Sequence, residues 1–207
     1  TQVMMTTSTT PGQGKSFISR NMAAILSMAG KKVILVDADI RKGTLSRTFG
    51  HTFGLTTYLS DDQCKVDDII RVDGLTKGVD FIPAGHQAPN PAELLMSKRL
   101  EILVSELRKR YDYVILDTTP LFAVADANVV ARVTDTTLFI IRVGVQTRSF
   151  LPTLERNYQD NRFKNMCIVL NDVDPEDPYK SNYGYGYGYG HHHTPKKGFI
   201  KRLRKRR

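Results

Sequence analysis

The sequence predicts an α/β domain built on a doubly wound, mostly parallel sheet. Short apolar runs alternate along the chain with stretches whose apolar residues recur at helical spacing. Most of the apolar runs lack the alternation of a half-exposed strand, so we expect helices to cover both faces of the sheet. The chain has 207 residues, 41% hydrophobic and 25% charged, which is the composition of a globular domain and excludes a disordered or fibrous protein.

The expected elements follow one another in regular order. Strands are expected at 2–6, 33–36, 79–82, 113–116, 137–143 and 166–170. Two amphipathic helices are expected, with apolar faces made of Ile18, Met22, Ile25, Leu26 and Ala29, ending at Gly30, and of Leu100, Leu103, Val104 and Leu107. Asn90 has the character of a helix N-cap, with Pro91 at the first helical position and Glu93 reaching back to the cap.

The character of the chain changes near residue 175. Residues 1–174 are expected to form the folded domain, and 175–207 a flexible tail of low complexity. The tail alternates tyrosine with glycine and continues into three histidines, His191, His192 and His193, for which a solvated stretch is favoured over a metal site. The last thirteen residues, 195–207, are strongly basic.

The charge of the chain is concentrated in that basic end. Of the 30 Lys and Arg residues, eight lie in 195–207, so the rest of the chain holds 22 basic against 21 acidic residues. A domain with so little net charge is not expected to bind nucleic acid. Cys64 and Cys167 show neither disulfide nor zinc spacing, and no apolar run is long enough to cross a membrane, so the chain itself is expected to be cytoplasmic.

A phosphate-binding loop follows the first expected strand. Residues 7–16 read Thr-Ser-Thr-Thr-Pro-Gly-Gln-Gly-Lys-Ser and lead into a helix, which is the context of a P-loop, although Thr9 stands where the standard motif has its first glycine. Backbone N–H groups at a helix start bind phosphate oxygens, Lys15 reaches the β- and γ-phosphates, and Ser16 binds Mg²⁺. The expected nucleotide-binding residues here are Thr10, Pro11, Gly12, Gln13, Gly14, Lys15, Ser16 and Phe17.

Three aspartates follow two other expected strands. Asp37 and Asp39 come after 33–36, and Asp117 comes after 113–116. Ligand sites in doubly wound sheets lie at the carboxyl ends of the strands, so these carboxylates should meet the P-loop. Asp117 is interpreted as the carboxylate that supports Mg²⁺, while Asp37 and Asp39 supply further metal support and a general base.

Together these motifs resemble a known family. The deviant P-loop, VILVDADIRKG at 33–43, PNPAELL at 89–95, YVILDTTP at 113–120 and the tyrosine cluster are similar to the bacterial tyrosine kinases. In that family this is the cytoplasmic domain of a polysaccharide co-polymerase that controls capsule or exopolysaccharide chain length. The resemblance covers residues 1 to about 189.

The resemblance implies a Mg-ATP-dependent protein-tyrosine autokinase that phosphorylates its own tail in trans. It makes Asp37 the base that takes the tyrosine proton, and Asp39 and Asp117 the residues that hold Mg²⁺. It also implies that Asn171 contacts adenine, although Asn171 equally suits a turn. The implied phosphorylation sites are Tyr179, Tyr183, Tyr185, Tyr187 and Tyr189.

The resemblance also implies partners and a location. They are a ring-shaped homo-oligomer, a transmembrane activator segment, a cognate tyrosine phosphatase and the cytoplasmic face of the bacterial inner membrane. The family's arginine-bearing helix that contacts a neighbouring subunit would precede Thr1. The resemblance also suggests that the 89–95 segment faces a neighbouring subunit. A purely structural role for this segment, as the start of a helix, is expected equally.

Two other functions stay open. In the first, the chain is a membrane-associating, division-site or partitioning-type ATPase switch, because Phe199, Ile200 and Leu203 share a helical face among cations suited to an anionic membrane. The hallmark of that class is a second lysine early in the P-loop, where this chain has Ser8, Thr9 and Thr10. In the second, the chain is a nucleotide-gated scaffold that binds without turnover.

Overall fold

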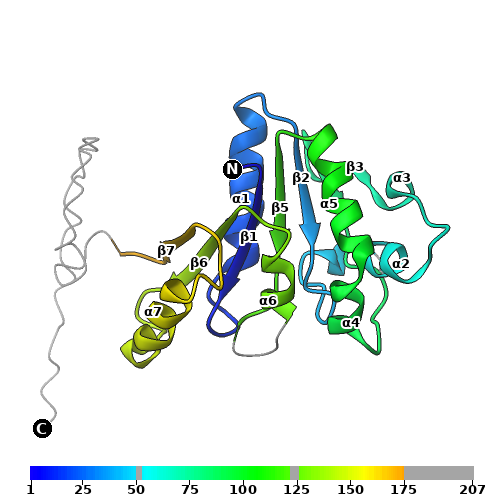
Figure 1. The fold of residues 1–207 in the computed structure, drawn as a ribbon. Helices are drawn as coiled ribbons and strands as arrows, with labels where there is room; N and C mark the ends of the chain where they lie inside the picture. The colour runs from blue at the N-terminus through cyan, green and yellow to red at the C-terminus, as the bar shows by residue number, and fades with distance from the viewer. Residues whose placement is uncertain (50–52, 122–125, 175–207) are drawn as a thin grey trace, which may run out of the picture. The chain divides into compact units, whose positions relative to one another are not determined.

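A seven-stranded sheet forms the centre of the fold in the computed structural model, which describes residues 1–49, 53–121 and 126–174 (Figure 1). Its strands are β1 Val3–Ser8, β2 Val33–Asp37, β3 Arg71–Thr76, β4 Val79–Ile82, β5 Tyr113–Asp117, β6 Thr136–Arg142 and β7 Met166–Asn171. The order across the sheet is β3-β4-β2-β5-β1-β6-β7, and every neighbouring pair is parallel except β3 with β4. This is the doubly wound α/β architecture expected from the sequence.

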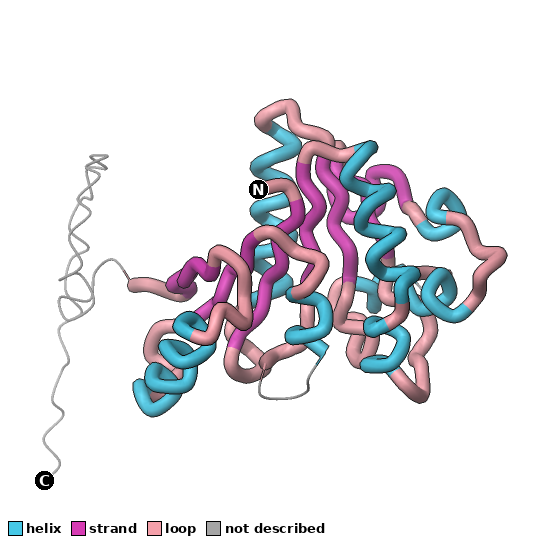
Figure 2. Tube along the Cα trace, viewed as in Figure 1, coloured by secondary structure: helices cyan, strands magenta, loops and turns pink. Residues whose placement is uncertain are grey.

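Helices cover both faces of the sheet (Figure 2). The α-helices are α1 Lys15–Met28, α2 Leu55–Ser60, α3 Val66–Ile69, α4 Pro91–Met96, α5 Lys98–Arg110, α6 Asp126–Ala131 and α7 Leu151–Gln159, and short 3₁₀ helices are η1 Ser46–Phe49 and η2 Arg148–Phe150. The apolar side of α1 packs with Leu35 and Ile115, while α5 packs with the alternate residues Val114 and Leu116. Because successive strand residues point to opposite faces, α1 and α5 lie on opposite sides of the sheet.

The six expected strands are present, and each begins and ends within two residues of its expected bounds. The sequence did not predict β3, the antiparallel edge strand. Asp73 has a positive φ of 52°, Gly74 follows it, and the pairing of β3 with β4 is irregular. A strand with an aspartate in the left-handed region and a glycine beside it lacks the usual strand composition, so only its partner β4 holds it in the sheet.

The expected face of α1 is partly wrong. The residues that α1 buries are Lys15, Ser19 and Ala23, with Met22 and Leu26 packed beside them, whereas Ile25 is 66% exposed. Small side chains at Ser19 and Ala23 let the helix approach the sheet closely, which turns Ile25 outward. The face of α5 is as expected, since Leu100, Leu103, Val104 and Leu107 are all buried.

The start of α4 differs in one contact from its expected form. Pro91 occupies the first helical position after Asn90, as predicted. Asn90 makes no side-chain bond to the helix backbone; its amide nitrogen instead donates to the carboxylate of Glu93 at 2.7 Å. The two side chains are therefore hydrogen-bonded to each other, and the predicted bond from Glu93 to the backbone of Asn90 is not formed.

The tail, and the predictions made for its residues, lie outside the described part of the chain. This applies to the boundary after residue 174, the five tyrosines, the three histidines and the basic end. In the part of the chain that the structure does describe, no helix has the length and apolarity that a membrane crossing requires.

Candidate active site

The P-loop joins β1 to α1 at the carboxyl edge of the sheet. Gly12 and Gly14 have φ values of 82° and 91°, a left-handed conformation that favours glycine. A Cβ on Gly14 would also lie 2.2 Å from Nδ2 of Asn171, at the end of β7. That Asn171 amide donates to the backbone oxygen of Gln13 at 3.0 Å, so the last strand supports the loop directly.

A second residue from outside the motif holds the front of the loop. Oε1 of Gln146, which follows β6, accepts hydrogen bonds from Thr9 at 2.8 Å, Thr10 at 3.2 Å and Gln13 at 3.3 Å. The Gln13 side chain is buried, and its oxygen accepts from the backbone N–H of Arg142 at 2.7 Å. The side chains of Thr10 and Gln13 are therefore engaged in supporting the loop, and the loop's shape depends on the segment after β6.

Lys15 and Ser16 open the first turn of α1 beside Asp117. Burial lowers the pKa of Lys15, and the charges of Asp117 and Asp39 oppose that shift. The hydroxyl of Ser16 donates to Oδ2 of Asp117 at 2.5 Å. The other carboxylate oxygen of Asp117 accepts from Thr6 at 2.9 Å and Ser19 at 3.0 Å. Desolvation raises the pKa of this fully buried carboxyl although four polar neighbours favour its charge.

Asp37 ends β2 and is completely buried. Its Oδ2 accepts from the hydroxyl of Ser46 at 2.6 Å and from the Ser46 backbone at 2.9 Å, while its Oδ1 has no hydrogen-bond partner within the described residues. Burial raises the pKa of Asp37 to about 7, and the Ser46 hydroxyl opposes that shift. A carboxyl with one vacant oxygen and a pKa near neutrality has the properties of a general base.

Asp39 belongs to the turn that follows β2. Its backbone oxygen accepts from the N–H groups of Lys42 and Gly43, and its Oδ1 accepts from Lys42 N–H at 3.1 Å. Asp39 lines a cavity of about 330 Å³ together with Lys15 and Ser16. The turn therefore fixes the Asp39 carboxylate at the edge of the phosphate-binding loop.

Most of the predicted site residues meet at that cavity. Its lining comprises Pro11, Gly12, Gly14, Lys15, Ser16, Phe17, Asp39, Lys42, Thr44, Arg47 and Pro120. Asp37 and Asp117 lie buried at the strand ends behind it, and Asn171 flanks the P-loop at Gln13. The structure thus brings together residues that are as many as 158 positions apart along the chain, the separation of Gln13 from Asn171.

Sequence reasoning missed several residues that shape this site. Ser46 returns to Asp37 nine positions later and also accepts from the N–H of Ala84 at 2.7 Å. Arg41 forms a two-point ion pair with Asp126, at 2.5 and 3.1 Å, and so joins the turn after β2 to the start of α6. No sequence motif predicts these contacts. The only available signal was that Arg41 closely follows Asp37 and Asp39, which indicates that this turn belongs to the site.

The donor set fits Mg²⁺. Ser16, Asp39 and Asp117 offer a hydroxyl and two carboxylates, the hard oxygen ligands that Mg²⁺ prefers, and this ion keeps several waters in place of a full protein cage. The described residues contain no group of three or more His, Cys, Asp and Glu side chains that could hold a metal ion.

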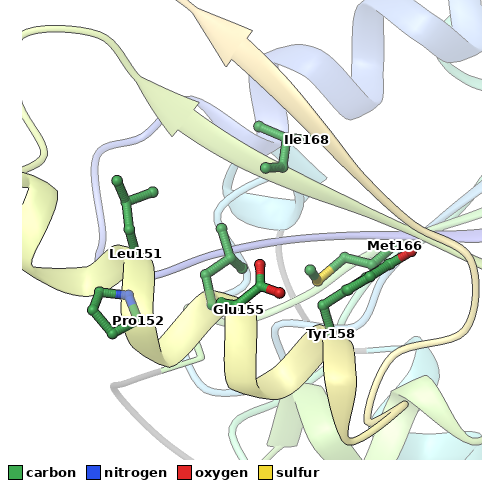
Figure 3. A pocket seen from close by; sticks show the side chains of 7 residues that line it. Leu151, Pro152, Glu155, Tyr158, Met166 and Ile168 are labelled. Atoms are coloured by element: carbon green, nitrogen blue, oxygen red, sulfur yellow. The ribbon is translucent and has the colours of Figure 1, made fainter.

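A second hollow lies elsewhere, between α7 and the edge strand β7 (Figure 3). It measures about 600 Å³, and its lining is mainly apolar: Leu151, Pro152, Leu154, Glu155, Tyr158, Met166 and Ile168. Glu155 is its single charged side chain. This lining has neither the lysine nor the glycine-rich backbone of the P-loop cavity.

Comparisons with known proteins show the family of this chain. A family described as an AAA domain matches residues 1–151. The solved kinase domain of the Escherichia coli tyrosine kinase ETK is 34% identical, with a TM-score of 0.77, and the match covers 91% of this chain and 72% of that one. The chain belongs to the bacterial tyrosine kinase family.

Two further relatives show how far this similarity extends. A protein of Klebsiella pneumoniae named as a putative tyrosine-protein kinase in the cps region is 39% identical over 173 residues, which is 83% of this chain and 24% of the relative. The chain thus spans about a quarter of the length of such curated relatives. A plasmid partition protein from Borrelia burgdorferi, 18% identical with a TM-score of 0.71 over 88% of this chain and 84% of that one, shows the same fold.

Proposed function

We propose that this chain is the catalytic domain of a Mg-ATP-dependent protein-tyrosine kinase that phosphorylates the tail tyrosines of a second copy. The observation that carries the proposal is the environment of Asp37, a buried carboxyl with one unpartnered oxygen behind a P-loop cavity. An ATPase needs to orient only water, whereas a kinase needs a base positioned for a hydroxyl. The five tyrosines of the tail would supply the acceptor hydroxyl, and relatives named as tyrosine kinases support this assignment.

The chemistry assigns a task to each residue. The tyrosine oxygen forms a bond to the γ-phosphorus, the bond from that phosphorus to the bridging oxygen of ADP breaks, and the tyrosine proton passes to the Asp37 carboxylate. Lys15 and the backbone N–H groups of the P-loop stabilise the charge on the transferring group. Mg²⁺, when bound, neutralises phosphate charge, and Ser16, Asp39 and Asp117 would hold it. Asn171, whose amide donates to the backbone oxygen of Gln13, would contact the adenine ring.

The deviant P-loop favours the kinase over a partitioning-type switch. Thr9 and Thr10 stand at the positions where that class has its second lysine, and both donate to Gln146. Their side chains are therefore engaged within the chain and carry no charge toward a partner's nucleotide. The match to a partition protein, at 18% identity, supports the shared fold alone.

The wider role is inferred from relatives. We propose that the phosphorylation state of the tail regulates a capsule or exopolysaccharide synthesis and export complex at the cytoplasmic face of the inner membrane. The partners would be further copies of the chain, a transmembrane co-polymerase segment, a cognate tyrosine phosphatase and an anionic membrane surface contacted by residues 195–207. The relative from a cps region supports this setting.

A mixing experiment tests transfer between copies. One chain carries Lys15→Ala and keeps its tyrosines; the other keeps Lys15 and carries phenylalanine at Tyr179, Tyr183, Tyr185, Tyr187 and Tyr189. With Mg-ATP, phosphate should appear on the tail of the Lys15→Ala chain only when both chains are present. Phosphate-free tails together with steady ADP release would replace the kinase with an ATPase switch, and nucleotide binding without ADP release would indicate a scaffold.

A further inference from the structure

The wall of the P-loop cavity that the segment after β2 forms carries two cations with no partner among the described residues. Lys42 and Arg47 both line the cavity and both are exposed. Neither forms an ion pair or a side-chain hydrogen bond within the described residues, whereas Arg41, Arg99, Arg108, Arg110, Arg132, Arg142 and Arg162 are each paired with a carboxylate. Two free cations therefore face the cavity from the same wall.

The backbone beneath these side chains is firmly held. The N–H of Lys42 donates to Asp39, and Ser46, which precedes Arg47, is tied to Asp37 and to Ala84. The wall is thus anchored on the same buried carboxyl that we assign as the base. Because the backbone is fixed, a ligand would have to order only the two side chains and would not have to rebuild the turn.

The net positive charge of the cavity lining favours a ligand with more negative charge than the P-loop alone would bind. The lining contains Lys15, Lys42 and Arg47 against the single carboxylate of Asp39. The positive charge of Lys42 acts on the P-loop side as well, since it contributes to lowering the pKa of Lys15. Neighbouring Arg41 takes no part, because its guanidinium is bound to Asp126.

We propose that Lys42 and Arg47 form an acceptor-side clamp on the γ-phosphoryl group of ATP. The P-loop surrounds the inner phosphates, so the outermost phosphate would extend beyond the loop into the cavity that these two cations also line. A nucleoside diphosphate ends short of the wall and leaves the clamp unused. The proposal rests on the proposed function for the identity of the nucleotide. In it, Lys42 and Arg47 provide the positive charge that Ser8, Thr9 and Thr10 lack.

The test compares two nucleotides that differ by the γ-phosphate. Titration calorimetry measures the Kd of Mg-AMP-PNP and of Mg-ADP for the purified chain and for Lys42→Gln and Arg47→Gln. Each variant should weaken AMP-PNP binding about tenfold, the value of one charged hydrogen bond, and change ADP binding less than about twofold. Glutamine keeps the backbone bond from residue 42 to Asp39.

Matched controls separate the clamp from a general loss of charge. Lys77→Gln, in the turn between β3 and β4, and Arg156→Gln, on α7, remove exposed and unpaired cations away from the cavity and should leave both affinities unchanged. The charge-retaining variants Lys42→Arg and Arg47→Lys should keep the preference for the triphosphate. Equal weakening of ADP and AMP-PNP, or no weakening of either, would overturn the clamp.

The outcomes also separate this proposal from the kinase. AMP-PNP does not transfer its γ-phosphate, so the measurement needs no turnover. A selective loss of AMP-PNP affinity in a chain that never phosphorylates its tail would uphold the clamp and reject the kinase. Phosphorylation of the tail by a chain whose Lys42→Gln and Arg47→Gln variants lose no selectivity would do the reverse.

Discussion

The hydroxyl of Ser16 lies 2.5 Å from Oδ2 of Asp117, although 101 positions separate the two residues in the sequence. Ser16 starts α1 and Asp117 ends β5, which is the strand next to β1 in the sheet. This bond fixes the P-loop against the strand end that carries Asp117, the carboxylate that we propose supports Mg²⁺.

The first prediction concerns the pH dependence of Asp37. A base must be deprotonated, and burial raises the pKa of Asp37 to about 7. The kcat/KM for tail phosphorylation reports on the free enzyme and should therefore fall as the pH drops below about 7. Asp37→Asn should lower the rate by about 10²-fold or more and abolish this acid limb. A steady-state pH profile checks both; an unchanged acid limb in Asp37→Asn would assign it to another group.

The second prediction concerns Gly14 and Asn171. Gly14→Ala places a Cβ 2.2 Å from Nδ2 of Asn171 at a φ of 91° and should lower the free energy of unfolding by about 1–3 kcal/mol. Gly12→Ala is the matched control, since its φ is 82° and nothing lies within 4 Å of the added atom. Urea unfolding should show a larger loss for Gly14→Ala, part of which Asn171→Ala restores. Equal losses at both glycines would show that Asn171 does not press on the loop.

The third prediction concerns the ion pair of Arg41 with Asp126. Asp126 is 1% exposed, so Arg41→Met leaves its charge buried without a partner. The free energy of unfolding should fall by about 3 kcal/mol, toward the lower end for a buried pair because Arg41 is partly exposed. Lys109→Met, which removes an exposed pair with Glu106, should cost about 0.5 kcal/mol or less. The double variant Arg41→Met with Asp126→Leu should recover most of the loss, and failure to recover any would contradict the ion-pair account.

The fourth prediction concerns Asp135 at the start of β6. Its carboxylate accepts from Arg108 and from the N–H groups of Gln2 and Val3, and the Arg108 hydrogen bond holds the pKa of Asp135 well below its usual range. Because the folded pKa is depressed, the stabilisation is present above the unfolded pKa of about 3.9 and is lost as the pH falls further. Asp135→Asn should therefore cost about 1–2 kcal/mol at pH 7, and the difference from the parent should shrink below about pH 4.

The control for Asp135 is a surface carboxylate. Asp160 lies 3.7 Å from Arg162 with both side chains about half exposed, so Asp160→Asn should change stability by less than about 0.5 kcal/mol at either pH. Urea titrations at several pH values give the comparison. A loss in Asp135→Asn that stays constant between pH 7 and pH 3 would show that the carboxylate charge is not its cause.

The fold could be predicted largely because its strands are buried on both faces. Apolar runs such as Val33–Asp37 and Tyr113–Asp117 exist only where helices cover the sheet from both sides, so their alternation with helices specifies the architecture. The edge strand β3 escaped prediction because Asp73 and Gly74 interrupt it and its pairing with β4 alone maintains it.

The site was predictable only where its residues follow strands in recognisable motifs. Lys15, Asp37, Asp39 and Asp117 could be assigned because parallel strands end at one edge, which brings unrelated segments together. Ser46, Gln146 and Asp126 could not, because each acts through a tertiary contact that depends on the path of a loop. An exposed Ile25 likewise follows from the close approach of Ser19 and Ala23 to the sheet, which spacing alone does not reveal.

The central claim is transfer of phosphate from ATP to the tail, and an intact-mass spectrum of the purified chain before and after Mg-ATP tests it most directly. The account predicts a ladder of phosphoryl additions that maps to Tyr179, Tyr183, Tyr185, Tyr187 and Tyr189 and is absent from Lys15→Ala. Lys31→Ala, an exposed lysine after α1, should show the same ladder as the parent. An unmodified parent chain that nevertheless releases ADP would contradict the account.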